Sequence, residues 1–113
     1  MFAKRAAVVG AGIVTLLGGV LVGQASASSM VTTYQAVNIR ETPSSGSRLQ
    51  GRYPANYQVL GLCWTYGETI SDNGVVNNIW VSTGKQYGIY SSFVSAVYLK
   101  GDARGNMPVS DRC

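Results

Sequence analysis

Histidine is absent from the sequence, and charged residues make up only 12% of it. Without histidine the chain cannot build a Ser-His-Asp triad, a Cys-His pair or the usual zinc sites. Glycosidase chemistry needs two carboxylates around one bond, whereas the acids here occupy turn-like or tail segments or a strand end: Glu41, Glu68, Asp72, Asp102 and Asp111. A Glu41–Glu68 pair remains open, but solvated turn residues are the simpler interpretation. We therefore expect a protein that is not an enzyme and has no metal or cofactor.

Cations are also few, and they are scattered along the chain. Seven of the nine Lys and Arg residues follow residue 27, where they are set against five acids. A nucleic-acid-binding protein needs its cations grouped on one face or along one helix. The pattern therefore predicts no nucleic-acid partner.

A glycine-rich stretch near the start, VVGAGIV at 8–14, has the letters of a dinucleotide-binding turn. Such a turn would need a third glycine where Thr15 stands, and an acidic residue about 20 positions further on. The first acidic residue of the chain is Glu41, and no second helical segment follows to complete a crossover. The dinucleotide interpretation therefore fails.

A secretory signal peptide explains more of this segment. Lys4 and Arg5 form a short basic start, residues 6–23 are uncharged and largely apolar, and Ala25-Ser26-Ala27 is a small-residue cleavage site. We therefore expect a helical signal peptide over residues 1–27, cleavage near Ala27 and a secreted protein without membrane contact. The apolar run approaches the length of a membrane span, so an uncleaved N-terminal anchor is the alternative.

The sequence has only two cysteines, Cys63 and Cys113. In an exported chain an even number of cysteines most simply forms disulfides. We therefore predict a Cys63–Cys113 disulfide that fastens the last residue to the domain. An intermolecular disulfide and a reactive thiol are the alternatives, but no histidine or CxxC spacing supports them.

Residues 28–113 show no helical periodicity over the length that a stable helix needs. Alternating, β-branched and aromatic segments instead predict strands over 37–40, 57–66, 79–82 and 93–99. Turns are expected after the first of them, at Asp72-Asn73-Gly74 and at Thr83-Gly84-Lys85. Short strands at this spacing predict an all-β, small antiparallel barrel. The expected organisation is a signal peptide at 1–27, a short polar leader at 28–36, a barrel at 37–100 and an irregular tail at 101–113.

Four stretches together resemble bacterial SH3-like domains of the SH3b or SH3_3 type: AVNIRETPSSGSRLQGRYP, YQVLGLCWTYG, NNIWVST and FVSAVYL. The resemblance covers Val37 to Leu99, and the whole chain is similar to small, secreted, stand-alone SH3-domain proteins of Gram-positive bacteria. It departs from the family pattern at Ser92-Phe93, where a Gly-Tyr pair is usual, and Gly88-Ile89-Tyr90 lies slightly earlier. The resemblance implies an SH3-like barrel with a ligand groove along the first strand and the loop after it. In this family the common role is to hold a cell-wall hydrolase on peptidoglycan.

We therefore expect a monomeric, cell-wall-associated binding module that recognises the peptide part of peptidoglycan. Asn38 and Arg40 form the outward pair of the first strand, and both side chains are suited to peptide amides or carboxylates. Trp64 and Tyr66 complete the candidate ligand-binding residues. The alternative is a secreted protein-interaction module, with a cell-envelope protein as its partner, or an inhibitor of an extracellular enzyme. This alternative would show an exposed apolar patch around Trp64 and Tyr66. Trp80 is expected to pack in the core or at its rim.

Overall fold

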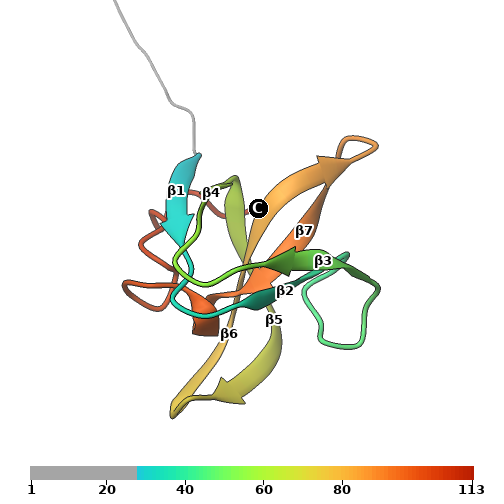
Figure 1. Cartoon of the computed structure of the whole chain (residues 1–113). Helices are drawn as coiled ribbons and strands as arrows, with labels where there is room; N and C mark the ends of the chain where they lie inside the picture. Colours follow the sequence, from blue (N-terminus) through green and yellow to red (C-terminus); the bar gives the residue numbers. More distant parts are fainter. Residues whose placement is uncertain (1–27) are drawn as a thin grey trace, which may run out of the picture.

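The computed structural model describes residues 28–113, and this part of the chain is all-β (Figure 1). The expected signal peptide lies outside the described residues. Within them, no helix combines the length and the apolar character that crossing a membrane requires. The elements are β1 (Ser29–Thr32), β2 (Val37–Arg40), β3 (Leu49–Tyr53), β4 (Gln58–Gly61), β5 (Cys63–Asp72), β6 (Val75–Gln86), β7 (Ile89–Ser95) and the 3₁₀ helix η2 (Ala96–Tyr98).

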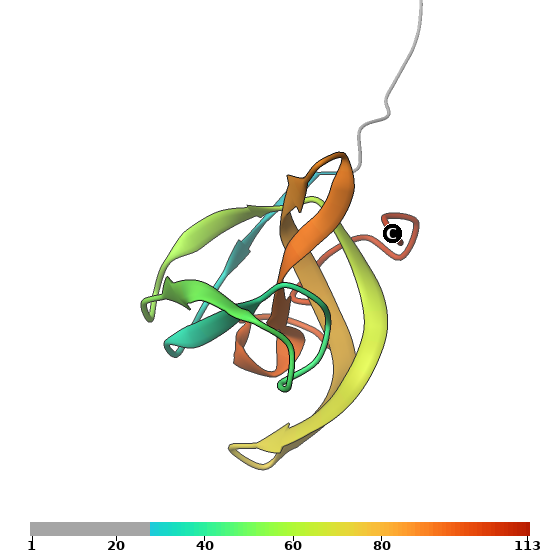
Figure 2. The same ribbon diagram turned by 90° about the vertical axis from the view of Figure 1, so that its right-hand side faces the viewer.

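The strands form two antiparallel sheets that do not close into a barrel. One sheet has the order β3-β2-β7-β6-β5 and the other contains only β1 and β4. Figure 2 shows the β2–β3 hairpin and the β5–β6 hairpin on opposite sides of the molecule. The prediction of an antiparallel all-β fold is confirmed, whereas the prediction of a closed barrel is wrong.

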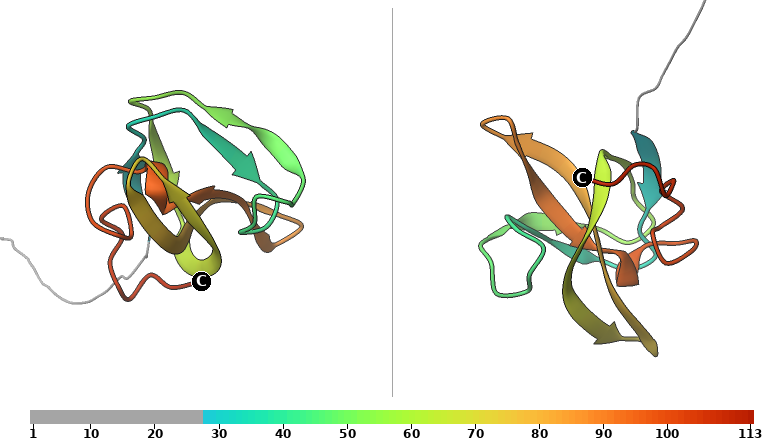
Figure 3. Two further views of the ribbon diagram at one scale, coloured as in Figure 1. Left: turned by 90° about the horizontal axis from the view of Figure 1, so that it is seen from below. Right: turned by 180° about the vertical axis from the view of Figure 1, so that it is seen from behind.

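The outer edge of β5 is covered in part by the C-terminal tail and not by another strand. At Trp64 this edge pairs with the C-terminal tail: the Trp64 N–H donates to the Asp111 carbonyl at 3.0 Å, and the Cys113 N–H donates to the Trp64 carbonyl at 2.9 Å. The tail thus satisfies backbone groups that another strand would pair with in a closed barrel. The predicted Cys63–Cys113 disulfide is present and holds the tail there. Figure 3 shows the course of the tail to the C-terminus.

The segment expected as a polar leader contains β1. Val31 and Thr33 are almost fully buried. The hydroxyl of Thr33 donates to the Pro54 carbonyl at 2.6 Å and accepts from the Tyr57 N–H at 3.0 Å, so its burial leaves no polar group unpaired. Hydrogen bonds of this kind let a polar-looking stretch enter the core.

The hairpin of β6 and β7 is long, in line with the departure from the family pattern at Ser92-Phe93, but its turn comes later than the sequence predicts. The strand β6 continues through Thr83-Gly84-Lys85, where a turn was expected, and the chain reverses at Tyr87 and Gly88, whose φ values are 52° and 75°. The last strand ends at Ser95 rather than Leu99, because the Ser95 hydroxyl accepts from the Val97 N–H and starts η2. The turn at Asp72-Asn73-Gly74 is confirmed.

The apolar core lies between the two sheets and the tail. It is built from buried residues of nearly every element: Val31, Val37, Trp64, Ile79, Val81, Val94, Ala96, Leu99 and Met107. Gly61 is required at the end of β4, because a Cβ there would lie 2.8 Å from the Met107 sulfur and 3.1 Å from the Ser29 carbonyl oxygen. The tail therefore contributes to the core as well as to the sheet edge.

Candidate functional site

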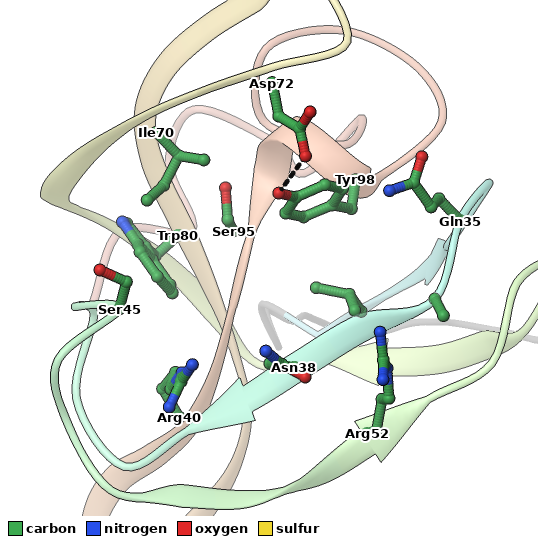
Figure 4. A pocket seen from close by; sticks show the side chains of 12 residues that line it. Gln35, Asn38, Arg40, Ser45, Arg52, Ile70, Asp72, Trp80, Ser95 and Tyr98 are labelled. Atoms are coloured by element: carbon green, nitrogen blue, oxygen red, sulfur yellow. Dashed lines mark hydrogen bonds between the residues drawn. The ribbon is translucent and has the colours of Figure 1, made fainter.

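A cleft of about 250 Å³ lies between the β2–β3 hairpin and the β5–β6 ladder (Figure 4). Its volume is slightly below the usual range for small-molecule sites, so it suits a small group such as a chain end or a short segment. The lining residues come from both hairpins, β7 and η2: Gln35, Ala36, Val37, Asn38, Arg40, Ser45, Arg52, Ile70, Asp72, Trp80, Ser95 and Tyr98.

The strands β2 and β3 supply a row of polar side chains along one side of the cleft. Asn38 is paired with Arg52 in the register of the two strands, so their side chains are neighbours on one face. A bulge between Ile39 and Arg40 shifts the register, and a bulge of this kind re-aims the side chain beside it. In Figure 4, Asn38 lies between Arg40 and Arg52.

The loop at 41–48 closes one end of the cleft and is fastened to β5 by Glu68. The Glu68 carboxylate accepts hydrogen bonds from the hydroxyl and the backbone N–H of Ser45, both at 2.7 Å, and from the Ser44 hydroxyl at 3.3 Å. The Glu68 N–H donates to the Pro43 carbonyl at 3.0 Å. The hydrogen bonds from Ser45 lower the pKa of the Glu68 carboxyl. This carboxylate therefore stays ionised and holds Ser45 at the cleft.

The tip of the β5–β6 hairpin forms the opposite end. The Tyr98 hydroxyl donates to one oxygen of the Asp72 carboxylate at 2.7 Å, and the Asn73 N–H donates to the other oxygen at 2.8 Å. The side-chain amide of Asn73 in turn donates to Gln35 at 3.0 Å. Desolvation, together with the hydrogen bond to Asp72, raises the pKa of Tyr98 to about 12, so its hydroxyl remains a donor at neutral pH.

Trp80 forms the apolar wall between these two ends. It is 3% exposed, and its indole N–H donates to the Glu68 carbonyl at 2.9 Å. Ile70 and Val37 add aliphatic surface to the lining. Trp80 is buried, as expected, but its ring also borders the cleft.

The four candidate ligand-binding residues do not form one site. Asn38 and Arg40 line the cleft, but Trp64 and Tyr66 do not. Trp64 is 5% exposed and lies in the apolar core, with its indole N–H directed at the carbonyls of Pro108 and Val109. Tyr66 is 48% exposed and meets the Arg112 guanidinium, which lies 4.7 Å from its ring centroid. The expected exposed patch around Trp64 is therefore absent from this surface.

Sequence reasoning missed Arg52, Asp72 and Tyr98 as cleft residues. The signal for Arg52 was available: once Asn38 is placed outward on the first strand, a hairpin partner on the next strand shares its face. Asp72 and Tyr98 have no such signal, because their approach depends on the length of the β5–β6 hairpin and on the turn that ends β7.

Exposed aromatic side chains gather at a second place, the tip of the β6–β7 hairpin. Tyr87 is 95% exposed and Ile89 is 71% exposed, while the Lys85 ammonium lies 4.8 Å from the ring centroid of Tyr90. Figures 1 and 3 show this tip projecting from the body of the molecule.

The chemistry available in the cleft is recognition by hydrogen bonds, charge and apolar contact. No group of three or more metal-ligating side chains occurs within residues 28–113. No family model, no curated protein and no solved structure matches the chain.

Proposed function

We propose that this chain is an exported, non-catalytic binding module of the SH3-like type, and that its cleft binds the peptide part of cell-wall peptidoglycan. The resemblance to bacterial SH3-like domains implies a groove along the first strand and its following loop. Val37, Asn38 and Arg40 of that strand and Ser45 of that loop all line the cleft. An oxidising location outside the cell agrees with the disulfide.

One observation carries the proposal: the cleft offers unpartnered groups of the kind that bind peptides. Among residues 28–113, the amide of Asn38 and the guanidinium of Arg52 make no side-chain hydrogen bond or ion pair, and they are neighbours across β2 and β3. An amide matches the donor and acceptor of a peptide bond, and Trp80 supplies apolar contact beside it.

The experiment is a pulldown of the oxidised protein comprising residues 28–113 on purified insoluble peptidoglycan, before and after its stem peptides are removed. We expect retention that disappears with the peptides, and that falls in Asn38→Ala. The matched control is Asn78→Ala, which changes an exposed asparagine of β6 outside the cleft lining. A protein that stays in solution with intact peptidoglycan would overturn the proposal.

A second candidate function, a secreted protein-interaction module, is favoured by the tip of the β6–β7 hairpin. Tyr87 and Ile89 expose apolar surface there with no packing partner to explain it. In that case, Tyr87→Ser should weaken capture of an extracellular protein while retention on peptidoglycan stays at background. The cleft proposal predicts that Asn38→Ala lowers retention on peptidoglycan and that Tyr87→Ser does not. These two variants therefore distinguish the two functions.

A further inference from the structure

The carboxylates around the cleft already accept hydrogen bonds from the protein, whereas the guanidinium groups of the cleft make few hydrogen bonds. Both oxygens of the Asp72 carboxylate accept hydrogen bonds, one from Tyr98 and one from Asn73. The Glu68 carboxylate accepts three hydrogen bonds from Ser44 and Ser45 at one of its oxygens and one from Ser45 at the other. The negative charge near the cleft is therefore already engaged by the protein.

The two guanidinium groups of the cleft are largely free. Arg52 is exposed, and its guanidinium makes no hydrogen bond or ion pair within the described chain. The guanidinium of Arg40 uses one N–H, which donates to the Ser47 carbonyl at 3.1 Å. The ion pairs of residues 28–113 are Arg48–Glu41 and Arg104–Asp102, so neither cleft arginine takes part in one. A guanidinium has five N–H donors in a planar fork that matches a carboxylate.

From this imbalance we infer that the cleft recognises a peptide through a free carboxylate bound by Arg52 and Arg40, with the Asn38 amide holding the adjacent peptide bond. This inference rests on the proposed function and specifies the chemistry that the cleft selects. Asn38 is the cross-strand neighbour of Arg52 and stands two positions before Arg40, and Figure 4 shows it between the two arginines. In the proposed complex, the peptide bond next to the bound carboxylate contacts the Asn38 amide. Trp80 and Ile70 then contact the neighbouring side chain.

The alternative ligand, an uncharged internal peptide segment, leaves the Arg52 guanidinium without a counter-charge, and leaves Arg40 only the attraction of the Glu68 carboxylate. Hydrogen bonds to charged groups are about twice as strong as neutral ones. A terminal carboxamide in place of the carboxylate should therefore lower affinity by about 10-fold or more.

The test measures binding of three acetylated tripeptides by calorimetry, each up to millimolar concentration. The first is acetyl-Ala-Ala-D-Ala with a free terminal carboxylate, the second is its carboxamide, and the third is acetyl-Ala-Glu-D-Ala carboxamide, which carries its carboxylate on a side chain. We expect the first or third peptide to bind at least 10-fold more tightly than the second. Whichever of them binds identifies a terminal or a side-chain carboxylate as the recognised group.

The variant Arg52→Gln should remove this discrimination and bind the acid and the amide alike. The control Arg48→Gln removes an equal charge outside the cleft lining and should keep the preference. Equal affinity of the wild-type protein for all three peptides, or no binding of either acid, would overturn the inference. Retention on peptidoglycan that Arg52→Gln leaves unchanged would also overturn it, although the proposed function would stand. Selective binding of an acid peptide without retention on peptidoglycan would overturn the proposed function alone.

Discussion

Trp64 and Trp80 occupy one ladder, formed by β5 and β6, but their side chains lie on opposite faces of it. Trp64 is paired with Val81 and Thr65 with Trp80, and successive side chains of a strand alternate between its two faces. Both tryptophans are nearly buried, at 5% and 3% exposure. One face of the ladder packs into the apolar core under the tail, and the other borders the cleft.

The region around Trp64 and the region around Trp80 are each stabilised by a different kind of interaction. Around Trp64, apolar packing is combined with a disulfide and with backbone pairing to the tail. Around Trp80, side-chain hydrogen bonds of Glu68 and Asp72 fix the loop and the hairpin tip. The first region is therefore expected to account for most of the stability, and the second for the shape of the binding site. Each prediction below tests this separation.

The largest effect is expected from Cys113→Ser. Cys113 is exposed, so the substitution leaves no cavity. It opens a disulfide with a sequence separation of 50, which should lower the free energy of unfolding by about 4 kcal/mol in the chain-entropy model. Urea unfolding followed by circular dichroism measures the change, and the reduced wild-type protein should unfold at the same urea concentration. An unchanged midpoint would show that the disulfide does not stabilise the fold.

Gly67→Ala acts on the cleft side of the ladder. A Cβ at this position would lie 2.5 Å from the Pro43 carbonyl oxygen and 2.6 Å from the Pro43 Cβ, so the loop must move away. We expect a loss of about 1–3 kcal/mol in the free energy of unfolding, as for overpacking elsewhere. Retention on peptidoglycan should fall as well.

Gly46→Ala is the matched control for this prediction, because its nearest neighbour, the Ser44 hydroxyl, would be 3.7 Å from the new Cβ. It should unfold close to the wild-type midpoint in the same urea titration. Identical midpoints for the two variants would mean that the close contact of the loop with β5 does not constrain the fold.

Local patterns were sufficient for the parts of the fold that depend on neighbours in sequence. The alternation at Val37–Arg40 and the turn signal at 72–74 both predicted features of the structure. The disulfide joins residues 50 positions apart, and it was predictable only because the chain has two cysteines. The prediction of a barrel was wrong, because the sheets do not close. At Trp64 the edge of β5 pairs with a distant segment, the tail, and no local pattern predicts such a contact.

Two of the four candidate ligand-binding residues were predictable, because their positions follow from a local pattern. The outward position of Asn38 and Arg40 follows from a two-residue period. The burial of Trp64 depends instead on carbonyl groups of Pro108 and Val109, more than 40 positions away, and no local pattern encodes such a contact.

A smaller effect is expected from Tyr98→Phe, which removes the hydrogen bond to Asp72. The free energy of unfolding should fall by about 1 kcal/mol near pH 7. The pKa of Tyr98 is raised to about 12, so the folded state favours the neutral phenol. The neutral Tyr98 phenol therefore stabilises the fold fully at pH values below the pKa of tyrosine in the unfolded chain, about 10. This stabilisation is lost as the pH rises through about 12. The difference in stability between wild type and variant should therefore shrink between about pH 10 and pH 12.

Unfolding titrations at several alkaline pH values check this dependence. Tyr87→Phe is the control, because Tyr87 is 95% exposed and its hydroxyl makes no hydrogen bond within the described residues. That variant should follow the wild-type curve. A difference between Tyr98→Phe and wild type that stays constant across this range would contradict the proposed role of the Asp72 hydrogen bond.

The smallest effect on stability is expected from Arg40→Ala. Arg40 donates to the Ser47 carbonyl, but Glu68 still holds the same loop through Ser45, and the freed carbonyl can be solvated. The free energy of unfolding should therefore fall by less than about 1 kcal/mol, whereas retention on peptidoglycan should drop because a cleft cation is lost. Urea unfolding and the pulldown on one preparation measure both. A variant that unfolds in buffer would show that Arg40 is a structural residue. It would also contradict the assignment of stability to the Trp64 region and of binding to the Trp80 region.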